Sequence, residues 1–240
     1  MSRFGFARRN TMIRRVLSTW LLSLPLPLVA APAAWPGSIA GRLAAEVELR
    51  SLSTELLSRD SATSTLDRWC TIHHMASNPT VIAERVPAET PSVPEDIRRV
   101  LQVSEGEPLV YRRVRLKCGT HLLSDAENWY VPSRLTPAMN TQLAATDVPF
   151  GRVIQALRFR RRTISSIPLW SPLPAHWEDR PSSEWETETA IQIPQYVLEN
   201  RAVLTVSDGF PISFVIERYT GGILSFAPPR AVLKSRLEHR

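Results

Sequence analysis

The segment VYRRVRLKCGTHLLSDAENWYV, residues 110–131, contains the pattern that decides the fold. Read with the period of two that strands follow, it places three uncharged side chains on one face: Val114, Leu116 and Cys118. The opposite face receives three cations in a row: Arg113, Arg115 and Lys117. Gly119-Thr120 then separates this run from a second strand-like run. The segment therefore predicts a β-hairpin with strands over 109–118 and 121–131.

The rest of the chain adds helices and a second hairpin to this unit. Apolar residues at helical spacing, turn residues and prolines predict helices over five ranges: 39–58, 65–75, 94–103, 132–145 and 152–162. Thr136 is the expected N-cap of the fourth helix and Pro137 its first residue. Further strands are expected over 80–86, 196–207 and 211–219, the last two joined at Asp208-Gly209. This order predicts a single α+β domain built on an antiparallel sheet.

Two regions show little or no strand-like periodicity. Residues 165–194, rich in Pro, Ser, Trp and Glu, read as an insertion or long loop. The densest basic cluster, RFRRR at 158–162, reads as a solvated helix end, where cations suit the helix dipole. The net charge of +6 comes from 29 Lys and Arg against 23 Asp and Glu. No long basic run stands beside an aromatic stacking motif, so nucleic acid is not expected as a partner.

The first 33 residues have the order of a secretory signal peptide. Residues 1–15 carry five arginines and no acid, and residues 16–31 are mostly apolar. Two prolines and the short length make that run a poor membrane span. Ala31-Pro32-Ala33 supplies the small residues that a signal peptidase reads. Export to the periplasm is therefore expected, and a cytoplasmic protein with an attached amphipathic helix is the alternative.

The cysteines and histidines do not form a metal-binding pattern. Cys70 and Cys118 are too few and too far apart for a zinc cluster. In an exported chain they could pair, and otherwise each is a small core residue. His73-His74 would point about 100° apart on a helix and make a poor metal pair. We expect no metal.

Lone polar residues within apolar strands are the remaining candidates for chemistry: Arg113, Glu127, Asn128 and Glu217. Glu217, in PISFVIERY, either faces water beside Arg218 or turns inward. Burial of the carboxyl group would tend to raise its pKa, which suits proton donation or a hydrogen bond to a hydroxyl. The residues alone leave both orientations open.

In order and spacing, these features resemble the chorismate lyase family, whose enzymes split chorismate into 4-hydroxybenzoate and pyruvate. The match spans about residues 65–220 and rests on five features: Leu66-Asp67 eight residues before Met75, Arg113 five residues before Cys118, Pro132, the helix-opening turn Pro149-Phe150-Gly151-Arg152, and Glu217 in the last strand. The resemblance implies a six-stranded antiparallel sheet with helical flaps over an internal pocket for a small aromatic carboxylate. It also implies a monomer, without metal or organic cofactor.

The resemblance carries site residues over by position. Arg113 would bind the carboxylate and Glu217 would meet the hydroxyl or ether oxygen, so both are the expected catalytic residues. Backbone at Met75 and Phe150 would complete the binding site. Asn128 stands in the site where the better-known lyases carry a second Arg, and Glu217 follows Pro211 by six residues where five are usual.

A second hypothesis follows from the conflict between export and a cytoplasmic substrate. The lyase fold is shared by the UTRA ligand-binding domains of transcription regulators, which bind small molecules without turning them over. The chain would then be an exported, non-catalytic binding protein for a small carboxylate, and a purely structural domain is a third possibility. The expected organisation is a signal segment (1–33), a helical extension (34–64), a lyase-like domain (65–226) with an insertion (165–194), and a basic tail (227–240).

Overall fold

The computed structural model describes residue 1 and residues 34–87, 89–186 and 189–230. The expected signal peptide therefore lies outside the described residues, apart from its first position, as do residues 231–240 of the expected tail. Among the helices of the described part, none has the length and apolar character needed to cross a bilayer.

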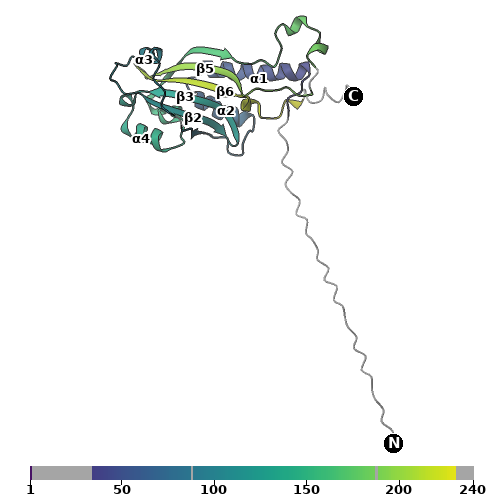
Figure 1. The fold of residues 1–240 in the computed structure, drawn as a ribbon, viewed down its shortest axis with the longest axis horizontal. Coiled ribbons are helices and arrows are strands. Elements are labelled where there is room, and N and C mark those ends of the chain that lie inside the picture. Colours follow the sequence, from purple (N-terminus) through teal and green to yellow (C-terminus); the bar gives the residue numbers. More distant parts are fainter. Residues whose placement is uncertain (2–33, 88, 187–188, 231–240) are drawn as a thin grey trace. The chain divides into compact units, whose positions relative to one another are not determined.

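One antiparallel sheet forms the centre of the domain (Figure 1). Its six strands follow the order β1-β2-β3-β6-β5-β4. Their bounds are β1 Val81–Arg85, β2 Val110–Cys118, β3 His121–Tyr130, β4 Arg160–Pro168, β5 Tyr196–Thr205 and β6 Pro211–Thr220. The α+β class and the six-stranded antiparallel sheet are thereby confirmed.

The α-helices of the described residues are α1 Ile39–Ser58, α2 Ala62–Ile72, α3 Glu95–Leu101, α4 Pro137–Ala145 and α5 Phe150–Val153. Three of these five, α1, α2 and α4, begin at a serine or threonine whose side chain caps the first turn. The Thr136 hydroxyl accepts a hydrogen bond from the Met139 N–H at 3.2 Å, which confirms the expected cap of α4. Short 3-10 helices lie at Pro132–Arg134, Gln155–Leu157, Trp177–Asp179, Ser182–Glu184 and Gly221–Leu224.

The helix predicted over residues 152–162 is wrong. Helix α5 ends at Val153, and the strand β4 begins at Arg160. Between them Arg158 adopts a left-handed conformation, with φ of 49°. That turn reverses the chain and lets β4 pair with β5, so most of the RFRRR cluster is strand rather than helix end. The expected insertion is correspondingly shorter, because β4 continues to Pro168.

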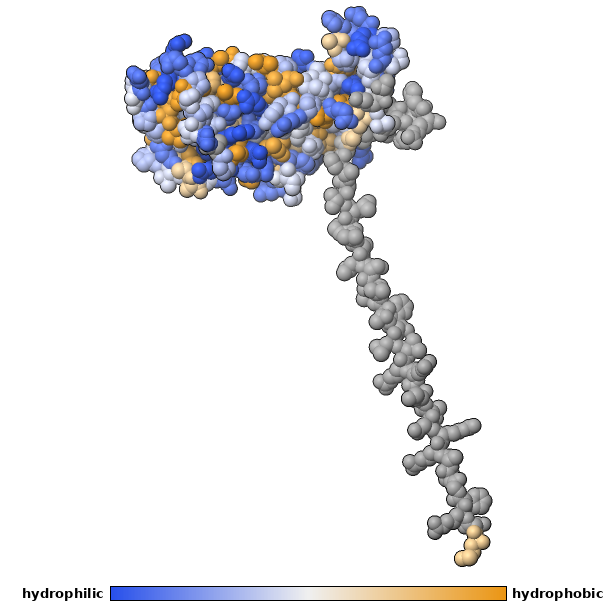
Figure 2. Space-filling model, in the orientation of Figure 1, coloured by the Kyte–Doolittle hydropathy of each residue, from blue (hydrophilic) through white to orange (hydrophobic). Residues whose placement is uncertain are grey.

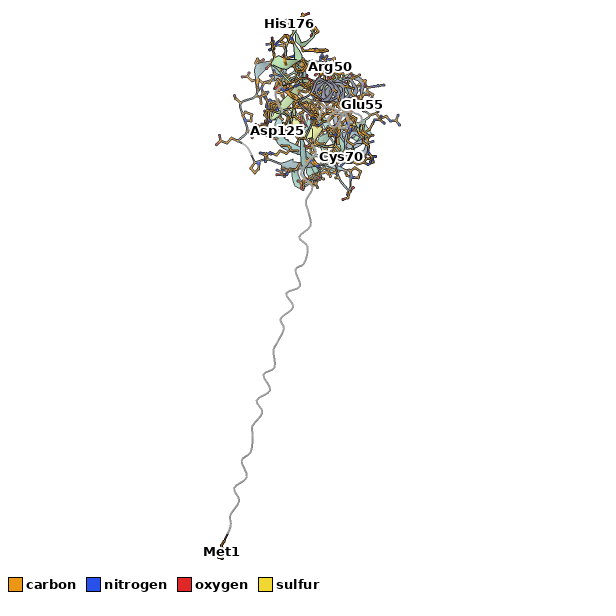
Figure 3. All side chains as sticks on the ribbon, turned by 90° about the vertical axis from the view of Figure 1, so that its right-hand side faces the viewer. Met1, Arg50, Glu55, Cys70, Asp125 and His176 are labelled. Carbon is orange, nitrogen blue, oxygen red and sulfur yellow. A yellow bond between two sulfur atoms is a disulfide. The ribbon has the colours of Figure 1, made fainter. Side chains whose placement is uncertain are left out.

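The two faces of the sheet have different surroundings. Helices α1 and α2 lie behind the strands in Figure 1 and share a core with them, whereas α3 packs on β6 at the other end. Hydrophilic side chains gather on the face turned to the viewer in Figure 2. In Figure 3, the view turned by 90°, Asp125 of this face and Glu55 of α1 lie on opposite sides of the domain.

Candidate functional site

An internal cavity of about 50 Å³ lies between the face of the sheet that α1 and α2 cover, here called the helix-covered face, and the starts of α2 and α5. Four of its polar lining side chains come from four strands: Arg112, Asn128, Arg161 and Glu217. Asp60, Ser61 and Thr63, at the start of α2, also line it. Much of the remaining wall is apolar and includes Val114, Leu116, Phe150, Phe159 and Val215. An apolar cavity with a few polar groups is the usual form of a small-molecule site.

The register of the sheet brings these side chains to one face. Arg112 lies directly opposite Asn128 on the neighbouring strand, and Ala126 lies opposite Glu217. Along β2, Arg112 shares the buried side of the strand with Val114, because residues two apart point the same way.

Arg112 is a buried cation that has no carboxylate at ion-pair distance among the described residues, although the charge of Asp147 acts on it from farther away. The residue is 7% exposed, and its Nη2 donates to the carbonyl oxygens of Val148 at 3.2 Å and Thr146 at 3.5 Å. Its Nε is buried and has no hydrogen-bond partner. Burial, together with the charge of Arg85, lowers the pKa of Arg112. A buried charge needs a partner to offset lost hydration, so an anion would be favoured beside Arg112.

Glu217 turns inward and is bound on two sides. Arg161 Nη2 lies 2.6 Å from Glu217 Oε2, and the two side chains are 2% and 8% exposed. The Tyr219 hydroxyl donates to the same oxygen at 2.9 Å. Burial, and then the charge of Glu217, raise the pKa of Tyr219 well above its usual value, so the hydroxyl keeps its proton. Arg161 Nε is buried without a partner.

Asn128 contributes a third unused donor. Its Oδ1 accepts a hydrogen bond from the Ser213 hydroxyl, which fixes the amide so that Nδ2 is the remaining group. That Nδ2 is buried and has no partner. The side chains of Arg112, Asn128 and Arg161 therefore each leave a buried N–H without an acceptor, and all three line this cavity.

The turn before α5 closes the cavity, and a glycine makes that closure possible. A Cβ at Gly151 would lie 3.2 Å from Thr63 Oγ1 and 3.3 Å from Ser61 Oγ, so the missing side chain lets α5 approach α2 closely. Arg152 then donates to Asp67 Oδ2 at 2.7 Å and to the Val81 carbonyl at 3.1 Å.

The disulfide between Cys70 and Cys118 joins α2 to β2 (Cys70 is labelled in Figure 3). The Cα atoms are 6.2 Å apart, within the range that disulfides span. Of the two alternatives from the sequence, the structure shows the paired one. The bond ties the helix whose start lines the cavity to the strand that carries Arg112.

Glu217, Asn128 and Phe150 all line the cavity, so the structure brings these three predicted site residues together. Met75 does not line it. This residue follows α2 and is buried in the core that α1 and α2 share with the sheet.

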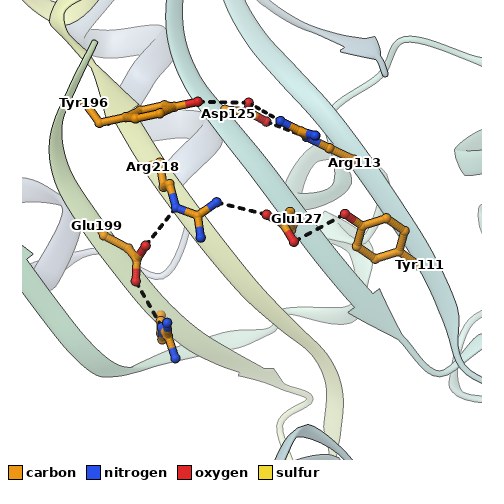
Figure 4. Close-up of polar contacts among 8 residues, drawn as sticks. Tyr111, Arg113, Asp125, Glu127, Tyr196, Glu199 and Arg218 are labelled. Atoms are coloured by element: carbon orange, nitrogen blue, oxygen red, sulfur yellow. Dashed lines mark hydrogen bonds and ion pairs between the residues drawn. The ribbon is translucent and has the colours of Figure 1, made fainter. Parts of the chain in front are cut away.

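The expected place of Arg113 in the internal pocket is wrong. Adjacent strand residues point to opposite faces, so Arg113 lies on the other side of the sheet from Arg112 (Figure 4). Its Nε and Nη2 donate to the two oxygens of Asp125 at 3.1 and 2.8 Å. Burial acts to raise the pKa of Asp125, but the hydrogen bonds from Arg113 prevail and lower it.

Sequence reasoning missed Arg112 and Arg161. The alternation that places Val114 and Leu116 inward also places Arg112 inward, so the signal was present in the opening segment. Arg161 alternates with the buried Phe159, but the cluster around it was interpreted as a helix end. Within the described residues, no group of three or more His, Cys, Asp or Glu could hold a metal.

Among solved structures, the chain is similar to effector domains of transcriptional regulators. The effector domain of PhnF from Mycobacterium smegmatis matches with a TM-score of 0.43 and 15% identity, over 68% of this chain and 89% of that one. Full-length PhnF matches with a TM-score of 0.44 and 14% identity, over 69% of this chain and 65% of that one. A GntR-family transcriptional regulator from Enterococcus faecalis V583 matches with a TM-score of 0.37 and 12% identity, over 58% and 93%.

Sequence comparison gives a nearer relative. No protein-family model matches the chain. The uncharacterized protein y4mC of Sinorhizobium fredii is 39% identical over 231 residues, which cover 94% of this chain and 97% of that protein. At this identity and coverage, the chain belongs to the same protein family as y4mC of Sinorhizobium fredii.

Proposed function

We propose that the chain binds a small aromatic carboxylate in the internal cavity. The observation that carries this proposal is the set of three buried N–H groups without acceptors, on Arg112, Asn128 and Arg161. A ligand with acceptor oxygens would satisfy these donors in place of water, and unsatisfied buried donors are costly.

The charges of the cavity specify the ligand further. Arg161 and Glu217 offset each other, which leaves Arg112 as the cation to be matched by an anionic group. Arg112 and Asn128 are opposite each other in the register, so one carboxylate could accept from both. Phe150 and Phe159 provide apolar surface for a ring. The carboxylate role that the sequence assigned to Arg113 passes to Arg112 in this proposal.

The experiment is a titration of the purified protein with 4-hydroxybenzoate by isothermal calorimetry. The matched control ligand is 4-hydroxybenzyl alcohol, which keeps the ring and hydroxyl but lacks the carboxylate. We expect saturable binding of the acid and at least tenfold weaker binding of the alcohol, because Arg112 gains a charge-assisted hydrogen bond only from the acid. Equal affinity for both ligands, or no binding of either, would sink the proposal.

Elimination of pyruvate from chorismate is our proposal for a reaction at the same site. Aromatisation of the ring drives this elimination, so the protein needs only to position the substrate and offset developing charge. Arg112 would hold the ring carboxylate, and Glu217, fixed by Arg161 and Tyr219, would face the oxygens at the far end. Incubation with chorismate, followed by assay of 4-hydroxybenzoate and pyruvate, tests it, and no product above a protein-free blank would exclude it.

Non-catalytic binding outside the cytoplasm is the second candidate, and the disulfide favours it. Disulfides persist in oxidising compartments and are rare in the cytosol. We therefore propose export, for which the N-terminal residues also argue. The N-terminal residue and the thiol content of protein recovered from its native host test this. An intact Met1 together with two free thiols would exclude export.

A further inference from the structure

A second pocket, which we call the outer pocket, lies at the edge of the sheet where β1 ends. Its volume is about 140 Å³, and it is lined by Arg85, Val86, Pro87, Tyr111, Arg112 and Arg113. The Val86 N–H still bonds to the Arg113 carbonyl at 3.0 Å, but Pro87 has no N–H to continue the ladder. Among the described residues, the pairing of β2 with this edge segment therefore ends here, and the pocket lies at this point.

Two of its three arginines have no carboxylate at ion-pair distance within the described part of the chain. Arg113 is paired with Asp125, whereas the hydrogen bonds of Arg85 and Arg112 go to backbone carbonyls. Arg85 donates to the Ala144 carbonyl, which belongs to the last turn of α4. Besides burial, the positive charge of Arg85 lowers the pKa of Arg112, because the two like charges lie near each other.

We propose that the outer pocket binds an oxyanion, either a carboxylate or a phosphate group, through Arg85 and Arg112. A guanidinium offers a planar pair of donors that fits both kinds of oxyanion. Arg112 Nε is buried and has no acceptor in the protein, so it can serve either an anion in the outer pocket or the carboxylate in the internal cavity, and the two would compete for it. An anion held there would also offset the repulsion between the two arginines.

The outer pocket is separate from the internal cavity but shares one residue with it. Arg112 lines both, whereas Arg85 lines only the outer pocket. The internal cavity has a mainly apolar lining, in which the charges of Arg161 and Glu217 offset each other, whereas three of the six residues that line the outer pocket are arginines. A small inorganic anion should therefore prefer the outer pocket, and an aromatic acid the internal cavity.

The alternative is that Arg85 and Arg112 serve only to hold the connection from α4 to α5, through the carbonyls of Ala144, Thr146 and Val148. Under that alternative, removal of Arg85 changes stability and has no effect on anion binding. The two explanations therefore differ in a measurable way.

The test is a calorimetric titration of the purified full chain with inorganic phosphate and, separately, with acetate, at constant ionic strength. Wild type is compared with Arg85→Gln and with Arg115→Gln, a variant that removes an exposed arginine of β2 outside the pocket. We expect saturable binding of one anion to one site, weakened about tenfold by Arg85→Gln and less than twofold by Arg115→Gln. The tighter of the two anions identifies the group that the site takes.

Arg85→Lys is the second variant, in case Arg85→Gln disturbs the fold, as shown by its melting temperature in anion-free buffer. Lysine keeps the positive charge but lacks the paired donors of the guanidinium, so we expect an anion affinity between those of the wild type and Arg85→Gln. Equal weakening by Arg85→Gln and Arg115→Gln, unchanged binding in Arg85→Gln, or no saturable binding to wild type would each overturn the proposal. Phosphate binding that depends on Arg85 in a protein that ignores 4-hydroxybenzoate would keep this site and remove the proposed function.

Discussion

Arg112 of β2 and Asn128 of β3 lie directly opposite each other on the helix-covered face of the sheet, and each presents a buried N–H without an acceptor. Their neighbours Arg113 and Glu127 are opposite each other in the same way but point to the other face, where each has partners of opposite charge (Figure 4). Two adjacent rows of one hairpin thus have different roles. The charged groups of Arg113 and Glu127 are paired within the protein, whereas Arg112 and Asn128 each keep a donor without an acceptor.

Arg112→Gln should weaken 4-hydroxybenzoate binding roughly 10- to 100-fold, because the ligand loses a charge-assisted hydrogen bond. Calorimetry measures the change, and Arg115→Gln on the exposed face is the matched control. Melting temperatures check that loss of the contacts to Thr146 and Val148 leaves the fold intact. A larger loss of affinity in Arg113→Gln than in Arg112→Gln would return the anion role to Arg113.

Arg161 and Glu217 should behave as a coupled pair in unfolding. Arg161→Gln or Glu217→Gln alone leaves a buried charge unpaired and should lower the free energy of unfolding by roughly 3–5 kcal/mol. The double variant removes both charges and should cost less than the sum of the two single changes. Urea unfolding of the four proteins measures this coupling. Strictly additive losses would show that the ion pair at 2.6 Å contributes no coupling energy.

Replacement of Cys70 and Cys118 by alanine should destabilise the protein by about 4 kcal/mol, the chain-entropy value for a loop closed over a separation of 48 residues. Urea midpoints of the wild type and the double variant, both without reductant, give this difference. Reductant should lower the midpoint of the wild type and leave the variant unchanged. A variant as stable as the wild type would contradict a tether between α2 and β2.

Stability should fall with acid below pH 6.5 because of His73. Burial, and then the nearby charge of His74, lower the pKa of His73 from 6.5 to about 4. The unfolded chain therefore binds the proton more readily between these values, and the contribution of His73, up to roughly 3 kcal/mol, is lost as the pH falls from 6.5 to 4. Unfolding free energies of wild type and His73→Gln across this range isolate the effect.

Titration of Glu48 opposes the effect of His73, and a second histidine provides a control. Glu48 Oε2 lies 3.6 Å from His73 Nε2, and burial raises the pKa of Glu48, so protonation of Glu48 favours the folded state in acid. The net slope of the wild type is therefore shallower than that of His73 alone. His121→Gln, which removes a histidine elsewhere, should keep the wild-type slope. If His73→Gln keeps it as well, another group controls the acid transition.

Periodicity predicted β2 well because this strand buries every second residue from Arg112 to Cys118. The opening hairpin follows an alternation that only one register satisfies, and β2 and β3 formed as expected. β4 was missed because its outer, exposed residues carry isoleucines while its inner face carries Arg161. A polar residue turned into a cavity inverts the pattern that sequence reasoning relies on.

The site was predicted in part for the same reason. Phe150, Asn128 and Glu217 were found through spacing, which survives small changes in register. The carboxylate-binding role was assigned to Arg113, one position after the Arg112 that lines the cavity. In a strand, adjacent residues point to opposite faces of the sheet. The partner of Glu217 could not be predicted, since Arg161 lies 56 residues away in the chain and on a strand that was not recognised.

The contacts of Arg152 determine how the cavity could open. This single side chain joins the turn of α5 to Asp67 of α2 and to the carbonyl of Val81 at the start of β1. Asp67 in turn accepts the Val81 N–H at 2.8 Å, so the three segments share one set of bonds. The segments that cover the cavity are consequently joined to one another. A molecule that enters the cavity between them would have to break the hydrogen bonds of Arg152 and Asp67 together.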